Sequence, residues 1–394
     1  MINSTKFEHK EYELTCIAPV HIGNGDVLKS YEYAYINNKG NRTVYFLDKM
    51  KWAKFLLESN LLDTYAAEAG RGKMILIDWL KRQRCVHNPE QLLKQLAIST
   101  AEAYPHTEVK RTLNDIARQA KSVQGVPYIP GSSIKGAIRT AILHHLIQKN
   151  PESYRSIWPE VKQAIQSHRG RKISSQQLEH IAFTKLPTTG RPDDALQSVM
   201  KGVSVSDAVR IDHKKNTVII QKLDVSKKRG ENNNSHYISL FRECIPAGTK
   251  LHFSITVDTE IMKYIGISSI EDLWKWSRDY IEEGLSMQKK VFDMNRDYIP
   301  EFKESELADV VLGGGTGFLS KTVYYALASD AEGRQVLAQF FDDIFTTKDR
   351  RTHMKQPAHH HQQDDDRLTP RTLKLAMTEG ERWIMGLASV KEVR

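Results

Sequence analysis

The chain has 394 residues, with 57 Lys and Arg against 48 Asp and Glu, which gives a formal charge of +9, and 40% of its residues are hydrophobic. This is an ordinary globular composition, so collagen-like, coiled-coil and wholly disordered chains are excluded. A chain of this length buries a large core and usually divides into two domains or carries insertions on a repeated module.

The amino terminus and the cysteines indicate a cytoplasmic chain without membrane contact. The first ten residues contain no apolar run of a signal peptide, and no stretch reaches the ~18 uninterrupted apolar residues of a membrane span. Cys16, Cys85 and Cys244 are odd in number and far apart, so they form neither a disulfide framework nor a four-ligand zinc site. We expect no cofactor, and the positive charge makes a polyanion the first partner to consider.

The first third of the sequence predicts strands followed by helices. Residues 11–18, 30–36 and 42–47 are rich in Tyr, Val, Ile and Phe and are separated by turn residues, which predicts an antiparallel sheet. After Asp48 the apolar residues recur at helical spacing. This predicts a helical insertion with helices at 52–57, 74–80, 92–98 and 109–120.

The remainder of the sequence completes an α+β pattern. Its predicted elements are a helix over 133–148, a basic hairpin at 208–230 around a strand at 217–223, strands 239–244 and 250–258 joined by a tight turn, helices within 268–293 and 320–343, and a strand at 383–390. The tract QPAHHHQQDDD at 356–366 is predicted to be a solvated loop. Adjacent histidines do not converge on one ion unless the backbone bends, so no metal site is expected there.

The first motif is APVHIGNG at 18–25, where a strand ends in a glycine-containing turn. Its backbone N–H groups, around Gly23, Asn24 and Gly25, form a nest that suits a phosphate. An ordinary turn that needs glycine for a positive φ angle explains the same residues. His21 is a candidate general base, although a lone histidine is more often structural.

The second motif is IPGSSIKGAIR at 129–139, at the start of the predicted helix. Ser132 or Ser133 can cap the helix, and Lys135 and Arg139 lie one turn apart, which suits a phosphodiester. Gly136 inside the first turns costs about 1 kcal/mol relative to alanine. We therefore expect another backbone to pass close to Gly136.

The third motif is LGGGTGFLSKT at 312–322, which holds Gly313, Gly314, Gly315, Thr316 and Gly317 directly before a helix. A phosphate-binding loop of the Walker A type requires glycine before its Lys-Thr pair, and Ser320 stands there instead. The motif favours a loop that lays its backbone along a nucleic acid, with Thr316 and Lys321 available to phosphates.

The three motifs, in this order, resemble the RAMP superfamily of CRISPR-Cas proteins. Four further segments contribute to this resemblance: SDA at 206–208, IPAGTKLHFSITV at 245–257, PRTLKLA at 370–376 and RWIMGLASV at 382–390. Within this superfamily, the ensemble is similar to the family of fifth subunits of the type III-A Csm effector complex. The resemblance extends over the whole chain.

The resemblance implies two ferredoxin-like, RRM-related modules with helical and hairpin insertions. We divide the chain into an N-terminal module at 1–185, a basic thumb-like insertion at 186–236 and a C-terminal module at 237–394. The resemblance also implies a non-catalytic subunit that binds the CRISPR RNA (crRNA), caps its 3′ end and assists its 3′ maturation in antiviral defence. The partners that it implies are a neighbouring backbone RAMP subunit of the Csm complex and recruited host nucleases.

Carried over by position, the resemblance implies that the glycine and serine motifs and the basic hairpin contact the guide RNA. The candidate RNA-binding residues are His21, Gly23, Asn24, Gly25, Ser132, Ser133, Lys135, Arg139, Lys214, Lys215, Lys227, Lys228, Arg229, Gly313, Gly314, Gly315, Thr316, Gly317 and Lys321.

Two other functions stay open at the level of sequence. Some RAMP proteins are endoribonucleases, and His21, Asp207 and Asp48 are the candidate catalytic residues here. The sequence contains no recognisable base held by a third group and no convergent carboxylate pair, which favours a non-catalytic chain. The second alternative is the repeated backbone subunit of the same kind of complex.

Overall fold

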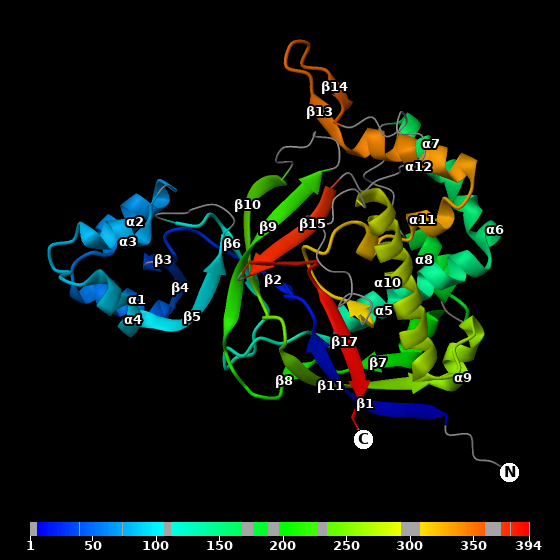
Figure 1. Cartoon of the computed structure of the whole chain (residues 1–394), viewed down its shortest axis with the longest axis horizontal. Helices are drawn as coiled ribbons and strands as arrows, with labels where there is room; N and C mark the ends of the chain where they lie inside the picture. Colours follow the sequence, from blue (N-terminus) through cyan, green and yellow to red (C-terminus); the bar gives the residue numbers. More distant parts are fainter. Residues whose placement is uncertain are drawn as a thin grey trace.

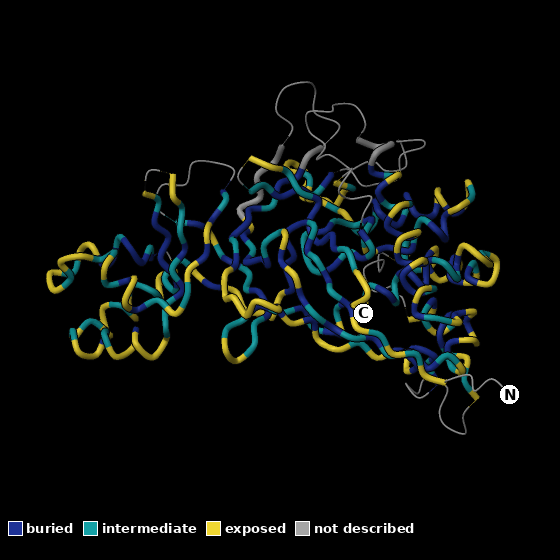
Figure 2. Tube along the Cα trace, turned by 60° about the horizontal axis from the view of Figure 1, so that its bottom comes forward, coloured by how far each residue is buried: buried dark blue, intermediate teal, exposed yellow. Residues whose placement is uncertain are grey.

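Two β-sheets lie at the centre of the molecule, with helices at both ends (Figure 1). The computed structural model describes residues 6–38, 40–72, 74–105, 112–167, 176–187, 197–226, 235–292, 308–358, 372–378 and 380–393. Buried residues follow the sheets and the helices that cover them, whereas the outer loops are exposed (Figure 2). The predicted α+β class is confirmed.

The first sheet has the strand order β12-β17-β1-β11-β7, with β8 also paired to β11, and all its pairs are antiparallel. Its strands are β1 (Phe7–Cys16), β7 (Val203–Val205), β8 (Val209–Arg210), β11 (Lys250–Asp258), β12 (Val310–Val311) and β17 (Leu387–Glu392). Alternate residues of β1 face the core, so Tyr12 and Leu14 are buried beneath the covering helices.

Two long helices cover this sheet, α5 (Gly131–Lys149) and α10 (Ile270–Phe292), and they pack against each other. Ile134, Ile138 and Ile142 recur on one face of α5 and enter the same core as Leu14. Along the chain the elements follow as β1, α5, β7, β11, α10 and β17. With the spatial order β17-β1-β11-β7, this is a ferredoxin-like arrangement.

The second sheet follows the path β2-β6-β10-β9-β5-β4-β3, and β15 joins it beside β9 and pairs with β16. Its strands are β2 (Gly23–Leu28), β3 (Tyr33–Asn38), β4 (Asn41–Leu47), β5 (Ala97–Tyr104), β6 (Ile116–Gln119), β9 (Thr217–Ser226), β10 (Ser235–Cys244), β15 (Thr372–Thr378) and β16 (Glu381–Trp383). This order differs from that of the first sheet, so the prediction of two ferredoxin-like modules is not confirmed.

The second sheet is curled, because its two ends contribute to one core. Leu28 at the end of β2 and Tyr33 at the start of β3 lie in the same hydrophobic cluster as Phe46 and Phe241. Residues 29–32 connect β2 directly to β3, yet these two strands form no ladder with each other. The curled sheet therefore has an open seam between β2 and β3.

The helical insertion predicted after Asp48 is confirmed. It consists of α1 (Lys49–Glu58), α2 (Leu62–Gly70), α3 (Leu76–Lys81) and α4 (Pro89–Leu96), which lie at the left of Figure 1. Asp48 caps α1 by accepting from the backbone N–H groups of Met50 and Lys51. Trp52 and Trp79 pack against residues of β3 in a separate core.

The other helices lie on the opposite side of the sheets. They are α6 (Pro151–Tyr154), α7 (Trp158–Gln166), α8 (Gln176–Phe183), α9 (Thr259–Met262), α11 (Tyr324–Leu327) and α12 (Ala331–Ile344). After α12 a short hairpin, β13 (Thr346–Lys348) and β14 (Lys355–Pro357), projects from the body of the protein at the top of Figure 1.

Two expectations about individual elements are corrected by the structure, and a third element lies differently from its neighbour in sequence. The helix expected over 109–120 is wrong, because residues 116–119 form β6, which is buried between β2 and β10. Residues 97–104 form β5, so the helix before it ends at Leu96. The strands β10 and β11 follow one another across a turn but belong to different sheets, because the turn carries the chain from one sheet to the other.

Within the basic hairpin predicted at 208–230, the expected strand is present as β9, but β9 pairs with β10, which begins only at Ser235, whereas β8 belongs to the first sheet. The division at 185 and 236 stays a prediction. Both sheets nevertheless combine strands from before residue 185 with strands from after residue 236, since β1 pairs with β11 and β17, and β6 pairs with β10.

Candidate nucleic-acid interface

The three glycine-containing motifs, which are far apart in the sequence, meet around one hydrophobic core. Val20 and Ile22 of the first motif, Ile134 of the second and Leu312 of the third all lie in the core beneath the first sheet. The first and third motifs also bond directly, because the Gly314 N–H donates to the His21 carbonyl at 2.8 Å. The structure thus brings these predicted site segments together.

The glycine-rich loop at 313–317 needs glycine because the first motif passes close to it. Gly313 has a φ angle of +77°, and a Cβ atom there would lie 2.0 Å from the carbonyl oxygen of His21. Gly315 has a φ angle of +90° and packs on Met385. Part of the glycine content expected to accommodate a nucleic acid is therefore explained by contacts within the protein. The sequence predicts that the Thr316 hydroxyl is available to a phosphate, but Thr316 is buried, so this hydroxyl is not accessible.

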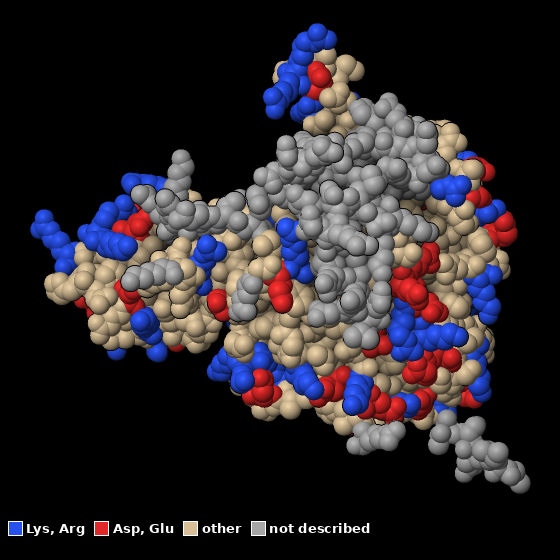
Figure 3. Space-filling model, in the orientation of Figure 1, with Lys and Arg blue, Asp and Glu red and all other residues tan. Residues whose placement is uncertain are grey.

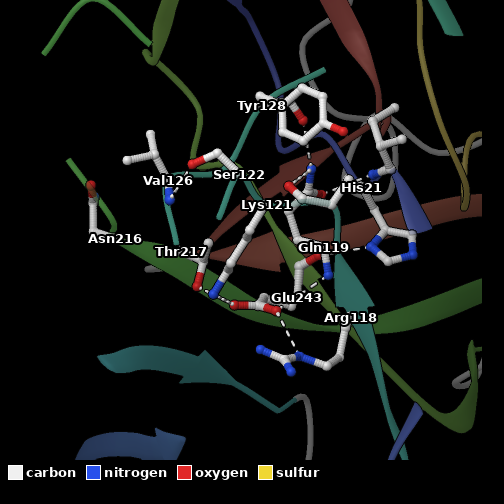
Figure 4. A network of polar contacts seen from close by, with 12 residues as sticks. His21, Arg118, Gln119, Lys121, Ser122, Val126, Tyr128, Asn216, Thr217 and Glu243 are labelled. Carbon is white, nitrogen blue, oxygen red and sulfur yellow. Dashed lines mark hydrogen bonds and ion pairs between the residues drawn. The ribbon is translucent and has the colours of Figure 1, made fainter. Parts of the chain in front are cut away.

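A buried polar network lies beside this junction (Figure 4). Glu243 is completely buried and accepts hydrogen bonds from the Thr217 hydroxyl at 2.8 Å and from the Gln119 N–H at 3.2 Å. Lys121 forms an ion pair with the same carboxylate. The Gln119 side chain in turn accepts from the Ile22 N–H. The network fixes β6, β9 and β10 to the first motif, so it positions the glycine turn.

His21 is held inside this junction and is not exposed at the surface. Its Nδ1 lies 2.7 Å from the backbone carbonyl of Glu243, so Nδ1 carries the proton that is donated. Burial, and then the positive charge of Arg242, hold the pKa of His21 below its usual value, against the opposing effect of that hydrogen bond. His21 is therefore a neutral structural residue at neutral pH.

We expect the stability of the protein to fall as the pH falls below 6.5, the ordinary pKa of histidine, partly because of His21. The unfolded chain takes up a proton at this position before the folded chain does, so acid favours unfolding in this window. His21→Asn should reduce the slope of unfolding free energy against pH, measured by urea unfolding between about pH 6.5 and 5. A slope unchanged by the substitution would contradict this account.

The other two candidate catalytic residues also have structural roles. Asp207 Oδ1 accepts from the Gly131 N–H at 2.8 Å and so caps helix α5 from another segment. Asp48 caps α1. Among the described residues, no group of His, Cys, Asp and Glu is placed to hold a metal ion.

The start of α5 differs from the sequence prediction in two respects. The helix begins at Gly131, and neither Ser132 nor Ser133 caps it, because Asp207 does so. A Cβ atom on Gly131 would lie 2.2 Å from the carbonyl oxygen of Val205, so the close backbone approach that we expected at Gly136 occurs at Gly131 instead. Nothing lies within 4 Å of the Cβ position of Gly136. Ser132 and Gly136 are exposed and leave this face of the first turns open.

The two cations of the second motif are already engaged within the fold. Lys135 donates to the Val203 carbonyl at 2.7 Å, and burial, followed by the charge of Arg139, lowers its pKa. Arg139 pairs with Glu179 and lies over the ring of Phe183. An RNA contact from either side chain thus competes with an internal partner.

A basic cluster that the sequence analysis did not identify lies beside the glycine-rich loop. It consists of Lys222 on β9, Arg242 on β10, Lys374 on β15 and Lys321 after the loop. Arg242 is opposite Ile220 and Lys374 is opposite Asp224, so the three strand residues share one face of the second sheet. These three residues come together only through the register of the strands, and a local sequence pattern does not contain that register.

The loop packs directly on this cluster. Cβ atoms at Gly314 and Gly315 would lie 3.8 and 3.9 Å from side-chain atoms of Arg242, and one at Gly317 would lie 3.4 Å from Lys374. Asp224 partly neutralises the cluster through Lys374 at 2.7 Å and Lys222 at 3.3 Å. Arg242 Nη1 is buried without a hydrogen-bond partner.

Electrostatically, this basic cluster suits an anion. Surrounding protein atoms, and then the charge of Arg242, lower the pKa of Lys321. Burial, and then the charge of Lys374, lower the pKa of Lys222. A phosphate placed here would relieve the mutual repulsion of the cations and accept from the guanidinium.

The remaining predicted contacts are exposed or lie outside the described residues. Gly23, Asn24 and Gly25 are exposed at the start of β2, and Gly25 has a φ angle of +92° with open space around it. Lys214 and Lys215 are exposed before β9. The predicted contacts that lie outside the described residues are Lys227, Lys228 and Arg229.

The hairpin β13–β14 carries a second basic surface that the sequence analysis did not identify. The exposed hairpin β13–β14 has Lys348, Arg350, Arg351 and Lys355 around its tip, where Figure 3 shows blue side chains gathered on the projection. Asp349 organises this tip by accepting from the N–H groups of Arg351 and Thr352. Most of the predicted low-complexity tract, residues 359–366, lies outside the described residues.

Comparisons with known proteins identify the family to which the chain belongs. The model of the RAMP superfamily matches residues 13–319. The chain is 26% identical to the CRISPR system Cms protein Csm5 of Mycobacterium tuberculosis over 84% of this chain and 87% of that protein. It is 25% identical to the protein of the same name from Streptococcus thermophilus, over 81% and 82%.

Two solved structures share the fold. A chain in the cryo-EM structure of a Csm–crRNA–target RNA ternary complex of a type III-A CRISPR-Cas system matches with a TM-score of 0.62 and 20% identity, over 97% of this chain and 100% of that one. The crystal structure of T. onnurineus Csm5 matches with a TM-score of 0.57 and 19% identity, over 81% and 94%. No helix among the described residues is long and apolar enough to span a membrane.

Proposed function

The chain belongs to the RAMP superfamily, and from this premise we propose that it is an RNA-binding subunit of a type III-A Csm effector complex in CRISPR defence. The relatives named Csm5 and the fold shared with a chain of a Csm–crRNA–target RNA complex support this position. They favour the fifth subunit over the repeated backbone subunit. The partners we propose are crRNA, a neighbouring backbone RAMP subunit and recruited host nucleases.

The observation that most supports RNA binding is the basic cluster of Lys222, Arg242, Lys321 and Lys374 beside the glycine-rich loop. Single-stranded RNA is held through its phosphates by Lys, Arg and backbone N–H groups, without a need for a base-specific code. The exposed turn at 23–25 directly follows the segment that bonds to this loop, and the open face of α5 at Ser132 and Gly136 lies on a helix of the same hydrophobic core. The β13–β14 hairpin offers a further surface for phosphates.

We further propose that the subunit caps the 3′ end of the crRNA, assists 3′ maturation and is not itself catalytic. The non-catalytic role is supported by the three candidate catalytic residues. His21 is buried and bonded to a backbone carbonyl, and Asp207 and Asp48 cap helices. A general base needs access to the proton that it removes, and His21 lacks such access in this fold.

Replacing Arg242 and Lys321 together with glutamine is expected to weaken RNA binding and to reduce its dependence on salt. If the chain neutralises roughly six phosphates, log K should fall with log salt at a slope of about −4, and removing two contacts should reduce the slope by about 1.4. The measurement is titration of a labelled guide RNA with the full chain at several salt concentrations.

The control for this experiment is Lys391→Gln, an exposed lysine near the end of β17 in the first sheet. The same variants, assembled with the other subunits, should yield crRNA with altered 3′ ends only when the basic cluster is changed or the chain is omitted. A flat salt response of the wild-type chain would contradict RNA binding. Cleavage of added RNA by the pure chain would favour an endoribonuclease.

A further inference from the structure

A cavity of about 270 Å³ lies where the helical insertion meets the open seam of the second sheet. Its aromatic lining comes from Phe46 on β4, Trp52 on α1 and Tyr65 on α2. Its charged lining is Lys49 at the start of α1, Arg118 on β6 and Glu32 in the connection between β2 and β3. Strands from both ends of the curled sheet therefore form its walls.

The seam leaves this cavity open because β2 and β3 do not pair with each other. Trp52 on α1 and Tyr65 on α2 belong to the core between the helical insertion and β3, where edge-to-face contacts with each other and with Trp79 hold them. One wall of the cavity is thus a cluster of aromatic rings that pack on one another.

Of the two cations at the cavity, Lys49 has no close partner in the described part of the chain, whereas Arg118 has a long ion pair with Glu243 and lies over the Phe46 ring. Lys49 is exposed and forms no ion pair among the described residues. Arg118 Nε is buried without a hydrogen bond, and its nearest carboxylate oxygen, in Glu243, is 4.0 Å away. That carboxylate is already bonded to Lys121, Thr217 and Gln119. Glu32 provides the single negative charge in the lining.

We propose that this cavity binds one nucleotide, with the base against the aromatic wall and the phosphate between Lys49 and Arg118. Flat rings stack on aromatic side chains with little dependence on base identity. An exposed ammonium group and a guanidinium group held only by a long ion pair favour a phosphate. The volume is just below the roughly 300 to 1,000 Å³ of pockets for drug-sized ligands, which fits one nucleotide and not a longer stretch.

This ligand chemistry has two possible sources, a free nucleotide or an unpaired nucleotide of the bound RNA. The second source rests on the proposed function. It is favoured by the position of Arg118, because β6 also contributes Gln119 to the Glu243 network beside the glycine motifs. Arg242 is opposite Ala117, so Arg242 and Arg118 lie on opposite faces of the second sheet, and an RNA strand that contacts both must pass around an edge of this sheet.

The test is photo-crosslinking of the full chain to guide RNAs that contain 5-iodouridine at single positions, followed by mass spectrometry of the peptides. We expect one RNA position to form adducts within residues 43–71, which include Phe46, Trp52 and Tyr65. Lys49→Glu should reduce this adduct and the affinity for that RNA by about tenfold.

The matched control is Lys51→Glu, because both lysines lie in the first turn of α1 and only Lys49 lines the cavity. An acidic side chain in this turn favours the helix equally in both variants. Competition of the adduct by AMP or UMP at concentrations that leave the RNA bound would identify a site that also takes free nucleotides. Adducts without such competition would identify RNA as the source.

The proposal is overturned if the RNA binds and crosslinks at the glycine motifs, but no adduct forms within 43–71 and neither AMP nor UMP binds in calorimetry. Failure of the proposed function gives a different result, because the chain would then bind no guide RNA at all. In that case binding of AMP or UMP that is lost in Lys49→Glu and kept in Lys51→Glu would still support the cavity as a nucleotide site.

Discussion

Replacing Glu243 with alanine is expected to destabilise the folded protein by about 3 to 5 kcal/mol, because it leaves a buried cation without its partner. The Lys121 side chain is only 12% exposed, and Glu243 is its counter-ion. The same substitution removes the acceptor of the bonds from Gln119 and Thr217. The measurement is the free energy of unfolding in urea.

A variant at Lys121 separates the contribution of the ion pair to stability from the contribution of the hydrogen bonds. Lys121→Met keeps the apolar stem beside the Phe46 ring, over which the ammonium now lies at 5.0 Å. We expect Glu243→Gln combined with Lys121→Met to be more stable than Glu243→Gln alone, because Lys121 is then no longer left as a buried charge without a partner. Equal stabilities for these two variants would show that the ion pair is not the origin of the effect.

The second large effect is expected from Gly313→Ala, which should detach the glycine-rich loop from the first motif. A Cβ atom at this position would lie 2.0 Å from the His21 carbonyl oxygen, so the backbone must move and break the bond from the Gly314 N–H. Besides a cost of about 1 to 2 kcal/mol for alanine at a positive φ angle, we expect a further 1 to 3 kcal/mol from the clash.

Gly25→Ala is the matched control for this prediction. Gly25 also has a positive φ angle, +92°, but nothing lies within 4 Å of its Cβ position. Gly25→Ala therefore shows the backbone cost alone, and the difference between the two variants measures the close approach at Gly313. Guide RNA binding should weaken in Gly313→Ala, because the loop no longer packs on Arg242. Equal effects of the two substitutions on stability would refute a close approach at Gly313.

Local patterns in the sequence predicted the elements that depend on local interactions. The helical spacing after Asp48 and along α5 is present in the structure, and so is the strand alternation of β1. The helix expected over 109–120 failed because a short apolar segment has no reliable period, and its burial in the second sheet as β6 decides its conformation.

The sequence by itself determined the α+β class, the helical insertion and the glycine motifs that resemble the RAMP superfamily, because turns, periodicity and glycine positions are local properties. Only the tertiary structure decided that β1 joins strands from the end of the chain, and that Arg242, Lys222 and Lys374 share one face beside the loop. Strand register couples residues more than a hundred positions apart, as between Asp224 and Lys374, and no short sequence window contains that information.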